Sequence, residues 1–388
     1  MLQIRVRPNP GRAAPDIYPT LSDRPPGHAA GGRCTAVEKR KQILPLQSKR
    51  IYQEEKMINL KTPHDLNVRV PEIDEEDISP KFNVEQLNKV KNYFNAEGYV
   101  VLKGIISSDI CDKACSLWEE QVKPFKGYMY RQAGTKAEKH VLNDRGWVMN
   151  PILNLQSIDP RFFNELRDHS VDKVFSNPNL KKVFEILLED KPKIVQSMYF
   201  EGNSATWEHQ DSYYLDSERI GTMAAAWVAL EDIKPEAGRF FVCPKSHLID
   251  LGRQNIKNNI ADKHDYYISQ IIDKITEEGL EIRAPKLDKG DVLFWNSWTI
   301  HGSLKSEDKL NSRSSITCHA IADKDLFLQR HSRTINTNCD NVNGVSIYRT
   351  KDQSKLLNRA MIFVESNFPT IFYYIKYRAV KFLIKRKD

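Results

Sequence analysis

The sequence contains no apolar run long enough to cross a membrane. None of its 388 residues belongs to a run that approaches the roughly 18 to 20 apolar residues of a spanning helix, so we expect a soluble protein. The N-terminus also lacks the apolar segment of a secretory signal. The cysteines follow no framework of regular spacings, which argues against a disulfide-built secreted domain and favours a reducing, cytoplasmic location. They are Cys34, Cys111, Cys115, Cys243, Cys318 and Cys339.

Basic charge is scarce in the central part of the chain, although the net charge of the whole is +7. Residues 1–56 carry 11 Lys and Arg against 5 Asp and Glu, and residues 375–388 carry 6 against 1. The two ends therefore contribute +6 and +5, which leaves a net charge of −4 on residues 57–374. A nucleic-acid groove needs basic side chains on the folded body, so we expect solvated tails and no nucleic-acid partner.

A sustained apolar period is missing from residues 1–56, and six of the first 26 residues are Pro. This composition predicts a disordered, basic N-terminal extension, followed by a linker over residues 57–81. Two other interpretations of the extension stay open. It is rich in Arg and poor in acids, like a mitochondrial presequence, although its prolines oppose an amphipathic helix. The abrupt change of composition at Met57 also fits a translation start there.

Order is predicted from residue 82 onward. Apolar spacing indicates helices over 83–95, from 107 onward and over 175–188, with a short strand at 99–102. The stretch 193–322 is rich in strands separated by Gly and Pro, at 194–201, 222–230, 238–243, 291–296 and 313–321. We therefore predict a mainly β fold with flanking helices around a double-stranded β-helix (jelly-roll, cupin-like) core over residues 82–322. A helical, polar insertion is expected at about 250–280.

Two further segments have features of their own. The stretch 124–165 reads as a long loop, and loops of that length are more often functional than idle. Its Arg131 and Lys136 are candidates to bind an anionic group of a substrate, with solvated loop charges as the default interpretation. Residues 323–388 form a predicted C-terminal extension that ends in a basic amphipathic helix. Docking of its apolar face onto the domain is favoured, and binding to a membrane surface is the alternative.

The chemistry of the chain centres on Thr206–Tyr213 and on a distant partner, His301–Ser303. His209 and Asp211 are two residues apart beside a predicted strand, and residues i and i+2 of a strand share a face. If His301 reaches the same place, the set is two imidazoles and one carboxylate. That is the facial ligand arrangement of non-haem Fe(II) oxygenases, which leaves coordination positions open on the other side of the metal.

The segment around Arg313 supports this metal hypothesis. Arg313 opens a predicted strand beside His301, where its guanidinium fork is suited to a carboxylate. Ser315, on the same face, would add a hydroxyl donor. The predicted buried strand 290–296 leads into His301 and would hold its imidazole on a rigid element.

Several separated blocks of this sequence together resemble the phytanoyl-CoA dioxygenase family of Fe(II)- and 2-oxoglutarate-dependent oxygenases. The blocks are 94–104, 196–198, His209-Gln210-Asp211 with Tyr214, 223–233, 238–247, and His301-Gly302-Ser303 with Arg313. They occur in the family's order over about residues 82–322, whereas His-x-Asp alone would be a weak signal.

The resemblance implies a role for each matching residue. His209, Asp211 and His301 match the iron ligands, and Arg313 matches the arginine that grips the distal carboxylate of 2-oxoglutarate. Trp227, Ser303 and, less directly, Gln196 match positions that line this cosubstrate. Asp211 also separates the chain from the halogenases related to the family, in which a small residue replaces the ligand carboxylate.

The function predicted from these residues is a dioxygenase that uses Fe(II), 2-oxoglutarate and O2. It would hydroxylate an unactivated C–H of a small organic metabolite or biosynthetic intermediate, with 2-oxoglutarate converted to succinate and CO2. An acyl-CoA or lipid substrate is the alternative. A non-catalytic module with the same fold, or a metal-dependent jelly-roll enzyme that is not an oxygenase, would be separated from it by metal content and 2-oxoglutarate dependence. The sequence does not identify the substrate or the oligomeric state.

Overall fold

The computed structural model describes residues 58–385, except for 135, 203, 250, 252–263, 307–310, 330–332 and 336. The predicted disorder of residues 1–56 and the first half of the predicted insertion at 250–280 therefore lie outside the described residues. The helices are α1 (Leu87–Glu97), α2 (Ser108–Leu117), α3 (Pro160–His169), α4 (Pro178–Leu188), α5 (His264–Glu277), α6 (Leu356–Asn367) and α7 (Pro369–Lys385).

The strands are short and fall throughout the described chain. In order they are β1 (Ile58–Lys61), β2 (Asn67–Val70), β3 (Lys81–Phe82), β4 (Tyr99–Leu102), β5 (Met129–Tyr130), β6 (Ala137–Glu138), β7 (Ile152–Leu153), β8 (Pro192–Phe200), β9 (Thr206–His209), β10 (Leu215–Ser217), β11 (Ala224–Ala229), β12 (Phe240–Val242), β13 (Val292–Asn296), β14 (His301–Ser303), β15 (Ser315–Ala322), β16 (Phe327–Gln329), β17 (Arg333–Ile335), β18 (Cys339–Val342) and β19 (Val345–Tyr348).

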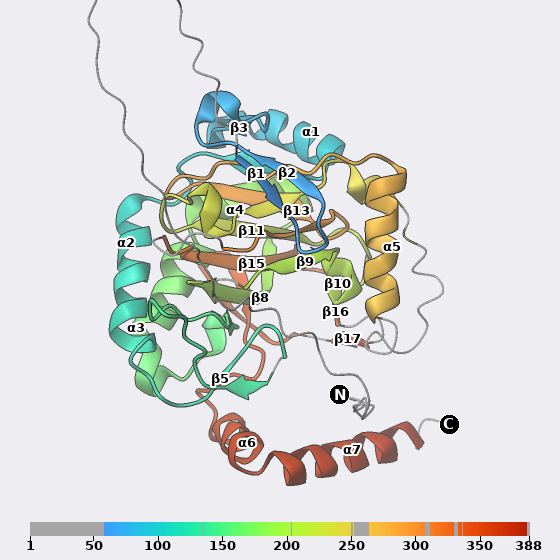
Figure 1. Cartoon of the computed structure of the whole chain (residues 1–388). Coiled ribbons are helices and arrows are strands. Elements are labelled where there is room, and N and C mark those ends of the chain that lie inside the picture. Colours follow the sequence, from blue (N-terminus) through green and yellow to red (C-terminus); the bar gives the residue numbers. More distant parts are fainter. Residues whose placement is uncertain are drawn as a thin grey trace, which may run out of the picture. The chain divides into compact units, whose positions relative to one another are not determined.

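A large sheet forms the centre of the fold (Figure 1). Its order is β18-β19-β8-β15-β11-β13-β4-β3, with β7 added beside β8. The strands β8, β15, β11, β13 and β4 pair antiparallel. Both faces of these strands are buried, and β4, β11 and most of β13 are continuous small and apolar runs. β8 and β15 also carry polar side chains.

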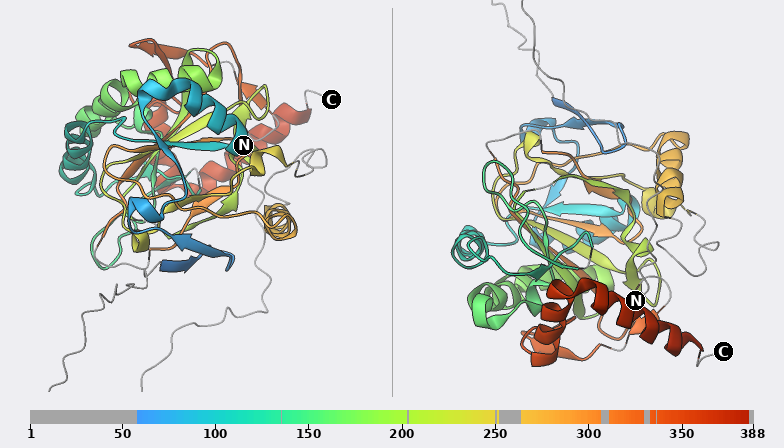
Figure 2. Two further views of the ribbon diagram at one scale, coloured as in Figure 1. Left: turned by 90° about the horizontal axis from the view of Figure 1, so that it is seen from above. Right: turned by 60° about the horizontal axis from the view of Figure 1, so that its bottom comes forward.

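Alternation along the strands separates two cores. Ala224, Ala226 and Val228 of β11 belong to the larger apolar cluster, which includes buried residues of α1, α2, α3 and α4. These helices cover the outer face of the large sheet (Figure 2). Trp227 points the other way and packs with Phe240 of β12 in a second cluster. Residues i and i+2 of a strand share a face, so β11 contributes side chains to both apolar clusters.

A small sheet of order β12-β14-β9 closes the other side of this inner core. The chain thus has two facing sheets with helices on the outer face of the larger one, which is the predicted jelly-roll architecture. Gly98 shows how helix and sheet are joined: it ends α1 with φ +81°, and a Cβ there would lie 2.5 Å from side-chain atoms of His247 and Thr299. Only glycine fits this left-handed, tightly packed position.

Two segments expected outside the core contribute to it. The predicted linker 57–81 contains the β1–β2 hairpin. This hairpin is part of the core, since its Val68 and Val70 pack against Phe241 and Leu304. Beyond residue 322, the β18–β19 hairpin extends the large sheet, with β19 parallel to β8. Both hairpins are short, and the sequence analysis did not predict them. The helical part of the predicted insertion is α5, which packs against the η6 turn (Asp211–Tyr213) through Tyr267 and Tyr213.

The C-terminal residues form α6 and α7, and α6 contacts β6. Ile362 of α6 packs against the apolar cluster that contains Met198 and Phe200 of β8. The buried Glu365 carboxylate accepts hydrogen bonds from the hydroxyls of Tyr130 and Tyr373, at 3.4 and 2.6 Å. Lys136 lies over the Tyr373 ring, 5.6 Å from its centre. Within the described residues, no helix has the length and hydropathy needed to span a bilayer.

Candidate active site

Two histidines and one aspartate meet at the edge where the small sheet faces the inner core. His209 ends β9, His301 begins β14, and the two are paired in register. Asp211 opens the η6 turn instead of continuing the strand, so the strand-face argument for Asp211 was wrong in detail: the turn, not strand alternation, directs the carboxylate. One ligand atom from each of the three residues lies within 4.8 Å of the others, and all three residues are buried.

Both imidazoles are oriented by backbone carbonyl groups. Nδ1 of His209 lies 2.8 Å from the carbonyl oxygen of Trp207, and Nδ1 of His301 lies 2.9 Å from that of Thr299. A carbonyl accepts but cannot donate, so each Nδ1 carries a proton, and Nε2 is the nitrogen left to face a metal. The two Nε2 atoms face Asp211, at 3.7 and 3.6 Å from its Oδ1.

The second oxygen of Asp211 is held by two side chains. The indole Nε1 of Trp295 donates to Oδ2 at 2.7 Å, and Nε2 of His319 lies 3.2 Å from the same oxygen. Such contacts fix a ligand carboxylate in one orientation. His319 therefore lies beside the candidate ligands and contacts one of them directly. The role of Trp295 was not predicted, because an indole on a buried strand reads as core until its partner is known.

The electrostatics suit a metal. Burial by itself raises the pKa of Asp211, but His301, His319 and His209 outweigh it and hold the pKa well below the usual range of a carboxyl group. Burial lowers the pKa of His301 to about 3, despite the opposing effect of Asp211. Asp211 is therefore ionised and His301 neutral at neutral pH, as metal ligation requires.

The donor set fits a first-row divalent metal. Two imidazole nitrogens and one carboxylate oxygen converge from one side, which is the pattern of non-haem Fe(II) sites with open positions. Among the described residues no cysteine joins this set; a thiolate ligand would favour softer or structural metals.

Arg313 is a buried cation on the inner side of the large sheet. Its guanidinium lies 5.1 Å from the Phe200 ring centre and 5.9 Å from that of Trp227, and one nitrogen donates to the carbonyl oxygen of Gly238 at 2.9 Å. Within the described residues, Nε has no hydrogen-bond partner and no carboxylate pairs with the side chain. Burial lowers its pKa to about 9. Burying a charge is costly unless it is paired, so this site favours an anionic ligand.

The remaining predicted residues lie near these groups. Ser315, Thr317 and His319 alternate with the outward-facing residues of β15, so they face the inner core. Trp227 pairs with Thr317 and Gln196 with His319, which places both on that face. Ser303 is buried two residues after His301. The Ser315 hydroxyl donates to the carbonyl oxygen of Arg313 at 3.2 Å, so its role as a ligand donor stays a prediction.

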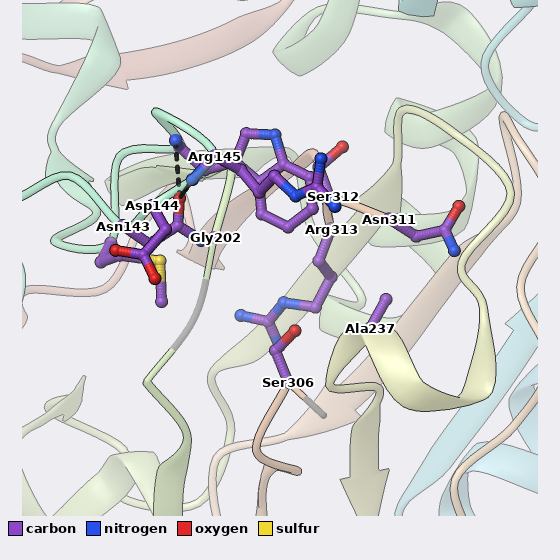
Figure 3. Close-up of a pocket in the computed structure, with 11 residues that line it drawn as sticks. Asn143, Asp144, Arg145, Gly202, Ala237, Ser306, Asn311, Ser312 and Arg313 are labelled. Carbon is purple, nitrogen blue, oxygen red and sulfur yellow. Dashed lines mark hydrogen bonds between the residues drawn. The ribbon is translucent and has the colours of Figure 1, made fainter. Parts of the chain in front are cut away.

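A pocket of about 170 Å³ lies beside Arg313 (Figure 3). Residues 143–149 of the long early loop form one wall, and Ala237, Ser306 and Ser312 form another. The three candidate metal ligands are not among its lining residues, so the pocket shares only Arg313 with the site described above. The loop at 124–165 therefore reaches the neighbourhood of the candidate site.

The expectation for Arg131 requires correction, and two other residues of the loops have contacts of note. Arg131 is buried and donates to the carbonyl oxygens of Glu138 and Asn150, at 3.2 and 3.0 Å, and it contacts His140. It is neither solvated nor free to bind a substrate, because its donors tie the loop together. Lys136 contacts Tyr373. His264 is partly buried, and its Nε2 lies 2.8 Å from the hydroxyl of Tyr214, whose ring is next to His209.

Known proteins agree with these features. A family model described as phytanoyl-CoA dioxygenase matches residues 94–312. Phytanoyl-CoA dioxygenase domain-containing protein 1 of Danio rerio is 27% identical over 273 residues, covering 59% of this chain and 87% of its own. The protein of that name from Bos taurus is 26% identical over 262 residues, covering 57% and 84%.

The chain is also similar to solved structures, two of which are those of SnoN and EctD. The epimerase SnoN from nogalamycin biosynthesis, in complex with Fe3+, alpha ketoglutarate and nogalamycin RO, has a TM-score of 0.46 at 16% identity and covers 69% of this chain and 97% of its own. EctD from S. alaskensis with 2-oxoglutarate and 5-hydroxyectoine has a TM-score of 0.43 at 17% identity, covering 67% and 84%.

The jelly-roll fold with its His-Asp-His set defines the class, a non-haem iron oxygenase dependent on 2-oxoglutarate. Because the family model spans more than half of the sequence, the chain belongs to the phytanoyl-CoA dioxygenase family. Iron, 2-oxoglutarate and O2 are the cofactor and cosubstrates of this class.

Proposed function

We propose that the protein hydroxylates an unactivated C–H of a small organic metabolite or biosynthetic intermediate. In this proposal His209, Asp211 and His301 hold Fe(II), and Arg313 binds the distal carboxylate of 2-oxoglutarate. Trp227, Ser303, Gln196 and Ser315 line the space that the cosubstrate occupies.

One observation carries the proposal: a buried cation without a carboxylate partner among the described residues lies on the same inner face as a three-ligand metal set. A dicarboxylate such as 2-oxoglutarate satisfies both, because its keto-acid end suits a metal and its far carboxylate suits a guanidinium fork. An isomerase with the same ligands would have no use for the second feature.

The residues of the chain then perform distinct tasks. With 2-oxoglutarate and O2, bound iron supplies the oxidising power, and the cosubstrate leaves as succinate and CO2. Trp295 and His319 keep Asp211 in one orientation. Glu231 accepts hydrogen bonds from the Ser312 hydroxyl, at 2.7 Å, and from the backbone amide of Ser314, and so holds the segment that carries Arg313. The buried aromatic walls exclude water, which strengthens the pairing of charges.

The net charge of the body gives more support to a small substrate than to a polyanionic one. The pocket of about 170 Å³ beside Arg313 is lined on the loop side by the polar Asn143, Asp144 and Arg145 and by Trp147 and Met149. An acyl-CoA or lipid substrate remains the alternative. The net charge of −4 on residues 57–374 gives no support to the binding of a polyanionic CoA group.

Succinate formation tests the proposal. The Fe(II)-loaded protein would be incubated with 2-oxoglutarate and O2, alone and with panels of small hydroxylatable metabolites and of acyl-CoA thioesters. We expect succinate release to be stimulated by a member of the first panel, with one oxygen atom added to that compound. Stimulation only by acyl-CoA thioesters would assign the alternative substrate, and 2-oxoglutarate turnover that is absent under every condition would contradict the function.

A further inference from the structure

The two C-terminal helices carry an apolar surface that the rest of the described chain leaves uncovered. Ile371, Tyr374 and Ile375 recur at helical spacing along α7, and Phe368 lies at the junction between α6 and α7. Each of the four is between 50% and 61% exposed. Residues three, four and seven apart share one side of a helix. The opposite side of α7 faces the body through Tyr373.

This surface continues onto neighbouring elements. The rings of Phe363 in α6 and Phe368 are 6.4 Å apart, and Leu356, Leu357 and Met361 of α6 are also exposed. Phe363 and Phe162 of α3 line a second pocket of about 170 Å³. We name the set of Phe162, Leu356, Leu357, Met361, Phe363, Phe368, Ile371, Tyr374 and Ile375 the C-terminal apolar surface. Monomeric soluble proteins rarely expose a large contiguous apolar patch without a use for it.

The charge beside this surface points to its occupant. Residues 375–388 have a net charge of +5, whereas residues 57–374 have −4. Arg378 follows Ile371 by seven positions on the exposed side of α7, with its guanidinium 5.8 Å from the Tyr374 ring centre. Apolar and aromatic residues flanked by Lys and Arg on one helix are typical of helices that lie in the interface of an anionic bilayer.

We propose that α6 and α7 form an interfacial anchor that binds the surface of an anionic lipid bilayer. The apolar side chains would enter the boundary between headgroups and acyl chains, and Arg378 beside them would pair with lipid phosphates. The acidic body is repelled by the same surface, so the anchor also orients the domain with the C-terminal helices toward the lipid. The proposal does not depend on the substrate or on the reaction.

Vesicle co-sedimentation of the full chain tests the anchor. The vesicles would consist of phosphatidylcholine alone or of phosphatidylcholine with about a third phosphatidylglycerol. We expect binding to the anionic vesicles at least tenfold tighter than to the neutral ones, with release in about 0.5 M salt. Failure of the wild-type chain to bind anionic vesicles would overturn the proposal.

Matched variants distinguish binding through the C-terminal apolar surface from nonspecific adsorption to vesicles. Ile371→Asp with Ile375→Asp removes the apolar contact without touching Tyr373 or Glu365, and should weaken binding by about tenfold or more. Ile78→Asp, at a residue 62% exposed outside the C-terminal apolar surface, should bind as the wild type does. Circular dichroism and thermal unfolding verify that each variant is folded.

Two further results would overturn the membrane anchor, and the second of them would identify another occupant of the surface. If the Ile371→Asp/Ile375→Asp variant binds vesicles like the wild type, the anchor is wrong. If the wild type is a dimer that this variant converts to a monomer, and neither binds vesicles, the occupant is a second copy of the chain.

Discussion

Arg313 is the residue whose environment departs furthest from what stability alone would select. A guanidinium that is 1% exposed, with an unbonded Nε and no carboxylate partner among the described residues, lowers the stability of the folded protein. Uncompensated buried charges of this kind occur where a ligand supplies the missing charge. Stability and cosubstrate binding should therefore respond in opposite directions when Arg313 is replaced.

Arg313→Met tests this opposition. The neutral side chain should leave the unfolding free energy of the ligand-free protein unchanged or raise it by about 1 kcal/mol, because a buried charge is removed. It should weaken 2-oxoglutarate binding by about 100-fold, since the bidentate pair is lost. Thermal unfolding and equilibrium titration measure the two effects. Arg313→Lys, which keeps the charge but not the fork, should bind 2-oxoglutarate with intermediate affinity. A variant that is destabilised yet binds normally would make Arg313 a structural residue.

Trp295 and His319 form the support of the metal site, since both contact Oδ2 of Asp211. Trp295→Phe removes only the indole donor and keeps an aromatic ring in the core. We expect Fe(II) affinity to fall about 10- to 100-fold, the range usual for partners of metal ligands, while thermal stability falls little. His319→Gln should have a similar effect on the metal. Unchanged Fe(II) affinity in both variants would show that the carboxylate needs no such support.

At the scale of elements, the fold depends on close approaches between the helical layer and the sheets. Gly290, just before β13, has φ +88°, and a Cβ there would lie 2.1 Å from the carbonyl oxygen of Ile106. Neither the backbone angle nor the space suits another residue.

Gly290→Ala should therefore lower the unfolding free energy by about 2 kcal/mol or more, because both strain and a backbone clash are introduced. Gly146→Ala is the matched control: its φ is +78°, but a Cβ there meets nothing within 4 Å, so only the conformational cost of about 1 kcal/mol is expected. Denaturant unfolding compares the two. Equal losses would show that the approach to Ile106 relaxes without cost.

The sequence was informative for elements with a strong local signal. The strand at 99–102 matches β4 and the helix ending at Gly98 matches α1, because their apolar spacing and the glycine cap are local features. The β1–β2 and β18–β19 hairpins were not predicted, since strands of four residues carry little periodicity and depend on partners distant in sequence. At the site, motif order indicated His209, Asp211, His301 and Arg313. The burial of Arg131 and the contact of His264 with Tyr214 depend on how the loops fold back, which spacing does not encode.

For the whole molecule, we propose that the catalytic unit is the jelly-roll domain predicted over 82–322, together with the hairpins that extend its sheets. The family match over 94–312 supports this assignment. The basic stretch 1–56 lies outside it. A chain beginning at Met57 should therefore bind Fe(II) and 2-oxoglutarate with the same affinity as the full chain, within about twofold. Loss of binding in this shorter chain, with its thermal transition intact, would assign the N-terminal extension a part in the site.

The central claim is that one site holds both iron and 2-oxoglutarate, and an anaerobic titration tests it most directly. Fe(II) would be added to the apo-protein, followed by 2-oxoglutarate, while the weak visible metal-to-ligand charge-transfer band of the chelate is recorded. We predict the band in the wild type, its loss in Asp211→Ala, and a shift to much higher 2-oxoglutarate concentration in Arg313→Ala. A wild-type protein that binds the metal but develops no band would contradict the account and favour a metal-dependent enzyme of another kind.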